Sequence, residues 1–483
     1  MTERGYINYD RKTLVKGAAW LALFTAAPAL AQEAAAVAAS TADAAATAAP
    51  VVTDAVAAAA PAAAEAAAPT PDKGDTAFMM IATVLVLLMI LPGLQLFYGG
   101  LTRSKNMLST MTQIGAATCF AMLIWVVYGY TMAFGPDASD AMKPFISNFD
   151  KMFLAGVTPD STAATFTKDV VIPEYVFIAF QMTFAAIAVS LVLGAVVERI
   201  KFSAVMVFTL VWLTIVYFPI AHMVWAAGGL FFELGALDFA GGTVVHINAG
   251  VSSLVAAIIL GKRIGFPREA MPPHSLTLTM VGTGLLWVGW FGFNAGSALE
   301  ANGSAALAMI NTFVATASAA LFWMLAERLA GHKPSSLGLA SGIIAGLVAV
   351  TPAAGNSGPF GAIVLGAVAA MVCYAAVAYL KPKLGYDDSL DAFGIHGVGG
   401  MVGAIGTGVV YSPALGGPGP ADYDMGAKLL VQMQAVGTTI VWAAVGTVIA
   451  IYIAKAVTGL RVPPEVEREG LDLGEHGERA YNN

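Results

Sequence analysis

The sequence predicts an all-α integral membrane protein with eleven transmembrane helices. Of its 483 residues, 58% are hydrophobic and only 11% are charged, whereas ordinary soluble domains carry roughly 25% charged residues. The apolar residues form blocks of about 20 residues, the length that a helix needs to cross a hydrocarbon layer of about 30 Å. The predicted spans cover residues 77–99, 108–134, 173–196, 203–225, 240–260, 275–297, 305–329, 337–355, 357–380, 392–412 and 429–457.

The chain before the first span is not expected to belong to the fold. Residues 1–31 have the pattern of a secretory signal peptide: a basic start, a short apolar run and the small-residue end Ala29-Leu30-Ala31. An uncleaved anchor is the alternative, and the sequence does not settle cleavage. Residues 32–72 are almost wholly Ala, Pro, Thr and Val, which predicts a disordered tail without an assigned role. The transporter domain is predicted over 73–460, with a cytoplasmic tail over 461–483.

Loop charges predict the orientation, because short cytoplasmic loops are enriched in Lys and Arg. If the N-terminus lies outside, the inside loops hold Arg103, Lys105, Arg199, Lys201, Lys262, Arg263, Arg268, Arg328, Lys333, Lys381 and Lys383. The basic residues of the outside loops are then only Lys143, Lys151, Lys168 and Lys428. We therefore predict an N-terminus outside and a C-terminus inside.

Two histidines fall deep within predicted spans. His246 lies eight residues beyond Asp238 in a span entered from outside, and His396 lies five residues beyond Asp391 in a span entered from the cytoplasm. At 1.5 Å per residue they sit about 12 and 8 Å into a layer whose half-thickness is about 15 Å. Matching positions in opposite halves predict two inverted five-helix repeats, followed by a final helix.

The alternative for each histidine is a buried side chain satisfied by a neighbouring carbonyl. Two at matching depth favour a pathway, because ionisable groups at this depth are costly. Small residues follow both of them, in Asn248-Ala249-Gly250 and Gly397-Val398-Gly399-Gly400. The helices can therefore approach until the imidazoles touch. A neutral imidazole donates from one nitrogen and accepts at the other, and its ordinary pKa of about 6.5 suits it to handling protons.

Composition limits the other classes of function. The net charge of −7 leaves no basic stripe for nucleic acid. Cys119 and Cys373 lie far apart in apolar blocks, so neither a disulfide nor a thiolate metal site is indicated. Two histidines without nearby acids are too few for a metalloenzyme or a nucleophilic site. No enzyme activity, cofactor or metal is expected.

Seven segments carry a resemblance to a known family. They are FYGGL (97–101), KNMLS (105–109), GAVVERIKFSAV (194–205), IAHMVW (220–225), GALDFAGGTVVHINAG (235–250), GWFGFNAGSA (289–298) and DAFGIHGVGG (391–400). They closely resemble the Amt/Mep/Rh ammonium transporters, in particular the bacterial Amt branch. The resemblance runs from about residue 74 to 483. It implies a homotrimer in a bacterial inner membrane, with one narrow, largely apolar pore per subunit.

Carried onto this sequence, the resemblance assigns places to seven residues, among them Asp238 as the carboxylate near the pore entrance. It implies an outer recruitment site formed by Trp225 and Ser297. It also implies that Phe184 and Phe293 stack directly below these two residues, where they form the gate and also contribute to recruitment. It implies that His246 and His396 line the pore as twin histidines.

The expected function is transmembrane transport of ammonium or ammonia, with methylammonium as an analogue. Ammonium resembles potassium in size and charge but has N–H donors and a removable proton. An aromatic cage attracts the cation, and the Ser297 hydroxyl can accept an N–H bond. Because a bare charge is costly at the bilayer centre, we hypothesise that ammonium loses its proton near the gate and crosses as ammonia. The sequence leaves open whether a proton follows, and it gives neither affinity nor rate.

Asp238 and Tyr98 each have two interpretations. Near the pore entrance, the Asp238 carboxylate could hold the cation directly or accept backbone N–H bonds at the start of its span. Its place before Gly241-Gly242-Thr243 favours the second role, in which the carboxylate accepts backbone N–H bonds. In that position its charge could still stabilise a nearby cation through space. Tyr98, in FYGG, is either a residue of the inner pore or a packed tyrosine.

The polar tail over 461–483 is either disordered or an ordered cytoplasmic segment, as the resemblance implies. The resemblance also implies tail contacts with neighbouring subunits and a PII-type regulatory protein on the cytoplasmic face. An ammonium sensor that signals through a cytoplasmic partner is the alternative function. An ion-coupled carrier is less favoured, because no carboxylate falls in mid-membrane between the predicted span ends.

Overall fold

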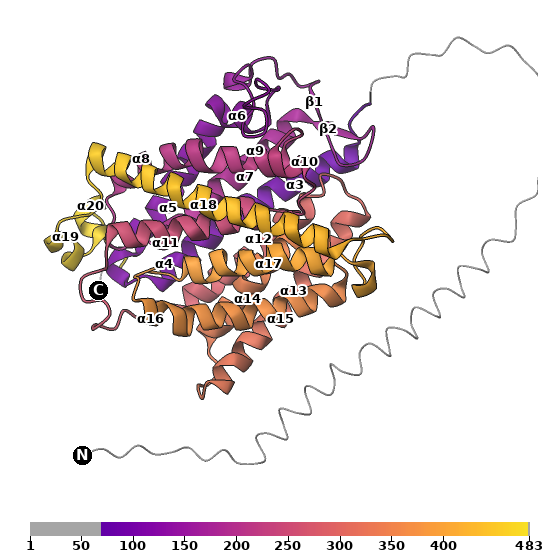
Figure 1. Cartoon of the computed structure of the whole chain (residues 1–483). Helices are drawn as coiled ribbons and strands as arrows, with labels where there is room; N and C mark the ends of the chain where they lie inside the picture. The colour runs from indigo at the N-terminus through magenta and orange to yellow at the C-terminus, as the bar shows by residue number, and fades with distance from the viewer. Residues whose placement is uncertain (1–68, 482–483) are drawn as a thin grey trace, which may run out of the picture. The chain divides into compact units, whose positions relative to one another are not determined.

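The computed structural model describes residues 69–481, and the predicted signal peptide and most of the Ala/Pro tail lie outside this part. Within it, eleven helical segments are long and apolar enough to cross a membrane (Figure 1). Each coincides with a predicted span. The ends differ by at most four residues, except in the fourth span, where the short helix α10 (Leu230–Glu233) extends the segment. The first span begins at Lys73.

The remaining α-helices follow in chain order. They are α3 Lys73–Leu88, α4 Gln95–Leu101, α5 Met107–Ile124, α6 Tyr130–Phe134, α7 Glu174–Leu193, α8 Phe202–Trp212, α9 Phe218–Trp225, α11 Asn248–Leu260, α12 Leu276–Gly296, α13 Gly303–Leu329, α14 Ser336–Val350, α15 Pro359–Ala375, α16 Lys381–Leu384, α17 Val398–Val410, α18 Met425–Thr458, α19 Pro464–Glu469 and α20 Leu471–His476. Short 3₁₀ turns lie at Ser104–Asn106, Met152–Leu154, Thr351–Ala353 and Pro413–Leu415. The strands β1 (Thr162–Ala164) and β2 (Val171–Pro173) form an antiparallel hairpin in which Ala163 pairs with Ile172.

Several spans contain a wider π-helical turn, at Met89–Leu94, Trp125–Gly129, Leu213–Tyr217, Gly242–Ile247, Ala376–Leu380 and Phe393–Gly397. The first contains Pro92, which has no backbone N–H to donate to the helix. The helical backbone conformation is interrupted at Leu91, just before this proline. Two of these turns contain the deep histidines: His246 lies in Gly242–Ile247 and His396 in Phe393–Gly397. Such turns are frequent at functional sites.

The two five-span halves meet through equivalent helices. The first span of each half pairs along α3 and α12, and the fifth spans cross where α11 contacts Phe393–Gly397 and α17 contacts Gly242–Ile247. A carboxylate begins each fifth span. Asp238 binds the backbone before one of them, and Asp388 accepts the N–H groups of Ala392 (3.1 Å) and Phe393 (2.8 Å) before the other. These contacts fit the predicted pair of five-helix repeats.

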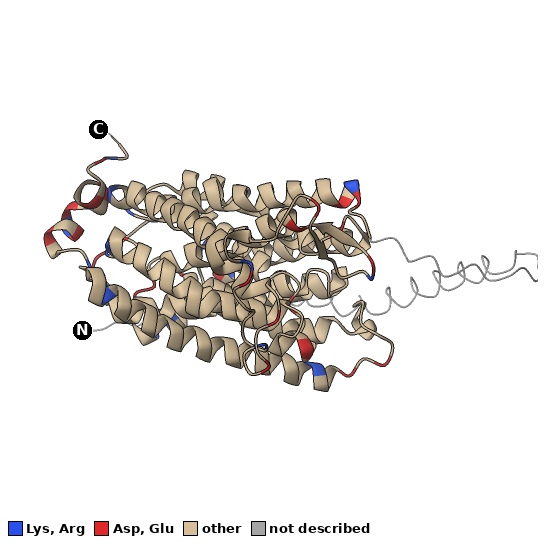
Figure 2. Cartoon of the chain, turned by 90° about the horizontal axis from the view of Figure 1, so that it is seen from above, with Lys and Arg blue, Asp and Glu red and all other residues tan. Residues whose placement is uncertain are grey.

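Most charged residues lie toward the two ends of the bundle (Figure 2). We call these the hairpin end, which carries β1 and β2, and the tail end, which carries α19 and α20 (Figure 1). At the tail end, Glu198 binds Arg103 (3.1 Å) and Arg263 (2.8 Å), and Arg263 also binds Asp387 (2.8 Å). Loops from both halves are thereby held together.

The tail is ordered in the described part of the chain and binds the tail end of its own bundle. Asp472 accepts the Ser109 N–H (2.7 Å), and Glu475 accepts the Phe202 N–H (2.8 Å), so both cap the starts of spans. Glu467 forms an ion pair with Arg461 (2.8 Å). Of the two interpretations of this segment, the structure supports the ordered one.

Candidate functional site

The two deep histidines touch inside the bundle. The Nδ1 atoms of His246 and His396 lie 3.3 Å apart, and their rings are nearly parallel, with planes 21° apart. Both side chains are buried, with 1% and 4% of their surfaces exposed. A bond between two Nδ1 atoms requires one to donate and the other to accept, which two neutral imidazoles of opposite tautomer satisfy. His246 Nε2 has no partner among the described residues and can bond to a small molecule.

Glycines make this contact geometrically feasible. A Cβ atom on Gly250 would collide with the backbone of Gly397, and one on Gly400 would lie 3.1 Å from the Cβ of His246. The span of His246 starts at Gly241, whose φ of 112° is a left-handed conformation that favours glycine. The sequence prediction that small residues let these helices approach is confirmed.

Trp290 supports the histidine pair and was missed by sequence reasoning. Its ring stacks on His246 with centroids 5.3 Å apart, and its Nε1 donates to Thr351 Oγ1 at 2.9 Å. The available signal was its spacing: Trp290 precedes Phe293 by three residues on α12, so both face the same side. Phe293 also lies beside His246, with ring centroids 6.1 Å apart.

Two stacked phenylalanines lie next to the pair on the side of the hairpin end. The rings of Phe184 and Phe293 are 4.1 Å apart with planes only 12° from parallel. Both are fully enclosed, with 1% and 0% of their surfaces exposed. Trp225 meets Phe184 edge-on at 5.7 Å. The structure therefore brings together the residues to which the resemblance assigned the gate and the recruitment site.

A cavity of about 440 Å³ opens at the hairpin end, above these rings. Trp225 and Ser297 line it, as does Gln181, whose Oε1 has no partner among the described residues. Sequence reasoning missed Gln181, although it lies one turn before Phe184 on α7. The Ser297 hydroxyl donates to the Phe293 carbonyl at 2.9 Å. Its oxygen is thus left free to accept a hydrogen bond from a molecule in the cavity.

Asp238 binds the backbone at the start of its span. Oδ1 accepts the N–H groups of Gly241 (2.8 Å) and Gly242 (2.5 Å), and Oδ2 accepts those of Thr243 (2.8 Å) and Val244 (3.2 Å) together with the Thr243 hydroxyl. Its backbone carbonyl also accepts the Trp225 indole N–H at 2.8 Å. This geometry favours the structural interpretation of Asp238, because its carboxylate is occupied by the helix start that it caps.

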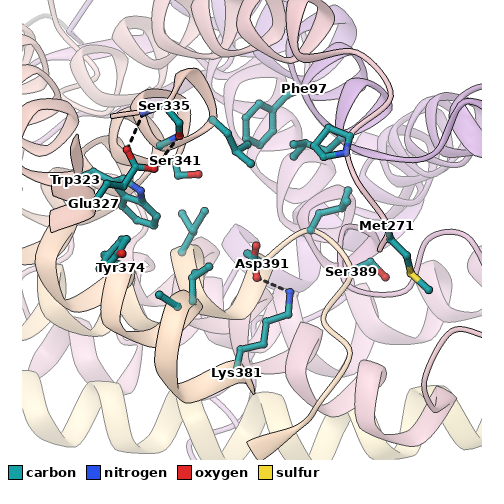
Figure 3. Close-up of a pocket in the computed structure, with 18 of the residues that line it drawn as sticks. Phe97, Met271, Trp323, Glu327, Ser335, Ser341, Tyr374, Lys381, Ser389 and Asp391 are labelled. Carbon is teal, nitrogen blue, oxygen red and sulfur yellow. Dashed lines mark hydrogen bonds and ion pairs between the residues drawn. The ribbon is translucent and has the colours of Figure 1, made fainter. Parts of the chain in front are cut away.

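A second cavity, of about 450 Å³, opens at the tail end (Figure 3). Ile395, the neighbour of His396 in the chain, lines it together with aromatic residues such as Phe97 and Trp323. Within it, Lys381 forms an ion pair with Asp391 at 2.6 Å. A cavity thus lies toward each end of the bundle. The stacked phenylalanines and the paired imidazoles lie in the interior of the bundle.

Tyr98 and His222 are held by contacts within the protein. Tyr98 is buried, donates its hydroxyl to the Leu191 carbonyl at 3.3 Å and packs its ring against Gly194. This geometry favours the packed-tyrosine interpretation. His222 contacts the carbonyls of Ala133 (2.8 Å) and Lys143 (2.6 Å) with its two nitrogens, which ties a loop of the hairpin end to α9.

An eleven-span bundle that encloses stacked aromatic rings and an imidazole pair is typical of one class of protein, the multi-pass membrane transporters. The comparison with protein families specifies which one. The model of the Ammonium Transporter Family matches residues 77–481, and the chain belongs to that family.

Known relatives cover almost the whole described chain. An ammonium transporter of Aquifex aeolicus is 48% identical over 412 residues, or 85% of this chain and 94% of the relative, and one of Bacillus subtilis is 44% identical, over 85% and 99%. Among solved structures, Saccharomyces cerevisiae Mep2 is 34% identical with a TM-score of 0.71, over 82% of this chain and 91% of that one. A structure named "Sensor Amt Protein" is 29% identical with a TM-score of 0.75, over 83% and 98%.

Proposed function

We propose that this chain transports ammonium across a bacterial inner membrane, taking up the ion at the hairpin end and releasing it at the tail end. The observation that carries the proposal is the buried imidazole pair, which lies next to two stacked phenylalanines and between two cavities. The distribution of loop charges supports an outside location for the hairpin end.

Recruitment takes place in the cavity that Trp225 and Ser297 line. The faces of Trp225 and Phe184 attract a cation, at about 0.5–2 kcal/mol per contact depending on desolvation. Ser297 accepts an N–H bond, because its own proton is already donated to the Phe293 carbonyl. Potassium has no N–H group to offer to this acceptor. Asp238 orients Trp225 and stabilises the cation through space without binding it.

The proton leaves ammonium near the gate formed by Phe184 and Phe293. A bare charge at the bilayer centre costs about 3 kcal/mol on insertion scales, which is roughly a hundredfold at 1.4 kcal/mol per factor of ten. Ammonium avoids this cost by giving up its proton and crossing as ammonia, whereas potassium has no proton to lose. The unpartnered Nε2 of His246 then offers ammonia a hydrogen bond inside the path.

The proton either returns to the outside or follows along the His246–His396 pair, whose shared hydrogen bond provides a route. Reconstitution into proteoliposomes distinguishes these two modes. A current that scales with ammonium requires the proton to cross, and uptake without current requires it to stay behind.

The quaternary structure and the regulator belong to the same proposal. We expect a homotrimer with one path per subunit and a PII-type protein that binds the face carrying the tail-end cavity. That cavity, of about 450 Å³, opens beside Ile395, so a partner inserted there would block the path next to His396.

Uptake of radiolabelled methylammonium by cells that express the wild-type chain, His246→Ala or His396→Ala tests the function. We expect uptake by the wild-type chain and a large loss in both variants at equal membrane abundance. A sensor that signals through a cytoplasmic partner is the second candidate, supported by the ordered tail at the tail end. Saturable binding of ammonium without uptake by the wild-type chain would favour the sensor and refute transport.

A further inference from the structure

Two loops from distant parts of the chain meet at the rim of the cavity that holds Trp225. The hairpin contributes the lining residues 162–166, and the loop between α12 and α13 contributes Ser297 and Leu299. Thr167, in the turn of the hairpin, donates its hydroxyl to Glu300 Oε2 in the α12–α13 loop at 3.0 Å. Glu300 therefore joins the two loops next to the proposed recruitment site.

Hydrogen bonds hold the loop that carries Glu300. Asn302 donates its side-chain N–H to Glu300 Oε2 at 3.1 Å, and its own Oδ1 caps the start of α13 at Ser304 N (2.9 Å). Asp75 accepts the N–H of the intervening Ala301 at 2.8 Å. The loop that carries Glu300 is thus hydrogen-bonded to α3 and to the start of α13, and Thr167 and Asn302 bind the carboxylate at the rim.

Glu300 forms no ion pair with any cation of the described residues, Lys168 beside Thr167 in the hairpin turn included. Among the other charged residues around the cavity, Lys151 pairs with Glu174 at 2.5 Å and Lys143 with Asp137 at 2.7 Å. Within residues 69–481, no ion pair includes Glu300, and its Oε1 is enclosed without a hydrogen-bond partner. A buried carboxylate oxygen without a partner is uncommon, and it is suited to attract a cation.

Glu300 is ionised at neutral pH. Burial opposes ionisation, but the side chains of Thr165, Thr167 and Asn302 stabilise the charged carboxylate, which outweighs burial and lowers its pKa. It follows Ser297 by three residues, so the two Cα atoms are at most about 11 Å apart. At that range a charge acts through space, and salt in the solution screens it.

We propose that Glu300 is a cation-recruiting residue, whose unpaired carboxylate raises the local concentration of ammonium at the Trp225 cavity. This inference rests on the proposed transport function. Glu300 is a positioning residue for the cargo, since it acts across the rim without contacting the gate or the imidazole pair. The bond from Asn302 alone is sufficient to keep the charge at the rim.

Glu300→Gln separates charge from structure, because the amide oxygen can still accept the bonds of Thr167 and Asn302. We measure the KM for methylammonium in proteoliposomes at low ionic strength, near 10 mM, and at high ionic strength, near 0.5 M. Removing one charge at about 10 Å in water changes a Coulomb attraction by about a factor of two. We therefore expect KM to rise about twofold at low ionic strength with the maximal rate unchanged. The difference should vanish at high ionic strength.

Thr167→Val is the matched control, because it removes the hydroxyl that joins the two loops but leaves the charge of Glu300. We expect its KM to equal that of the wild-type chain at both salt concentrations. If the KM of Glu300→Gln matches that of the wild type at low ionic strength, the inference is overturned. A rise in KM that both variants share and that does not depend on salt also overturns it, because Glu300 would then only hold the two loops together. These outcomes presuppose transport by the wild-type chain. Its absence would instead refute the proposed function.

Discussion

Replacement of Asp238 by Ala should both destabilise the protein and abolish transport. The Asp238 carboxylate accepts four backbone N–H groups, from Gly241, Gly242, Thr243 and Val244. Each unsatisfied buried N–H costs about 1–3 kcal/mol, so even the low end of the range sums to about 4 kcal/mol. The substitution also frees the segment whose carbonyl holds the indole of Trp225.

Asp424 provides a matched control on the same end of the bundle. It caps the start of α18 in an exposed position through a single bond, to Ala427 N at 3.0 Å, so Asp424→Ala should cost about 1 kcal/mol. At roughly 2 °C per kcal/mol for a large chain, the apparent Tm of the purified protein should fall by about 8 °C for Asp238→Ala and about 2 °C for the control.

Thermal unfolding in detergent, followed by tryptophan fluorescence, measures both Tm values, and methylammonium uptake measures function. Asp238→Glu should restore little of either, because its extra methylene displaces both oxygens from the donors that they now meet at 2.5–3.2 Å. Equal Tm values and full uptake in Asp238→Ala and Asp424→Ala would refute the capping role and the electrostatic role together.

Three other predictions concern packing, pH and the support of the imidazoles. Gly250→Ala should abolish uptake because its Cβ meets the backbone of the crossing helix, whereas Gly437→Ala, where a Cβ meets nothing within 4 Å, should be silent in the same uptake assay. Burial opposes ionisation of Glu198, but Arg263 and Arg103 outweigh burial and lower the pKa of Glu198. The ionised carboxylate therefore stabilises the folded protein fully above about pH 4.3, the ordinary pKa of a glutamate. This stabilisation is lost as the pH falls through the lowered pKa. Glu198→Gln should therefore have a lower Tm than the wild type at pH 7 and a shallower loss of Tm on acidification; identical profiles would contradict this. Trp290→Leu removes a stacking contact with His246 worth about 0.5–1.5 kcal/mol, so uptake should fall roughly two- to tenfold, and unchanged uptake would refute a supporting role.

The spans could be predicted from sequence because crossing a hydrocarbon layer imposes a length. Helix α18 runs over Met425–Thr458 where 429–457 was predicted, and α13 over Gly303–Leu329 where 305–329 was predicted. The fourth span was underestimated. Its helix ends at Trp225 as predicted, but α10 resumes after a short break, which a hydropathy pattern does not reveal.

The histidine contact was also within reach of the sequence, because depth and small neighbours follow from residue order alone. The π-helical turns around His246 and His396 were not, since they depend on how two helices cross. Asp238 and Tyr98 were each left with two interpretations because a sequence does not show which donors surround a polar group. Trp290 and Gln181 were missed for a related reason: aromatic and amide residues within apolar blocks are common, and only tertiary contacts distinguish these two.

The central claim is that cargo passes the imidazole pair as an uncharged molecule. Parallel fluxes of methylammonium and of rubidium, a tracer for potassium, into proteoliposomes that contain the wild-type chain test it most directly. We expect saturable methylammonium uptake that is lost in His246→Ala, together with rubidium flux no greater than in protein-free liposomes. Rubidium flux comparable to that of methylammonium would show that a cation without a removable proton crosses the path, and would contradict the claim.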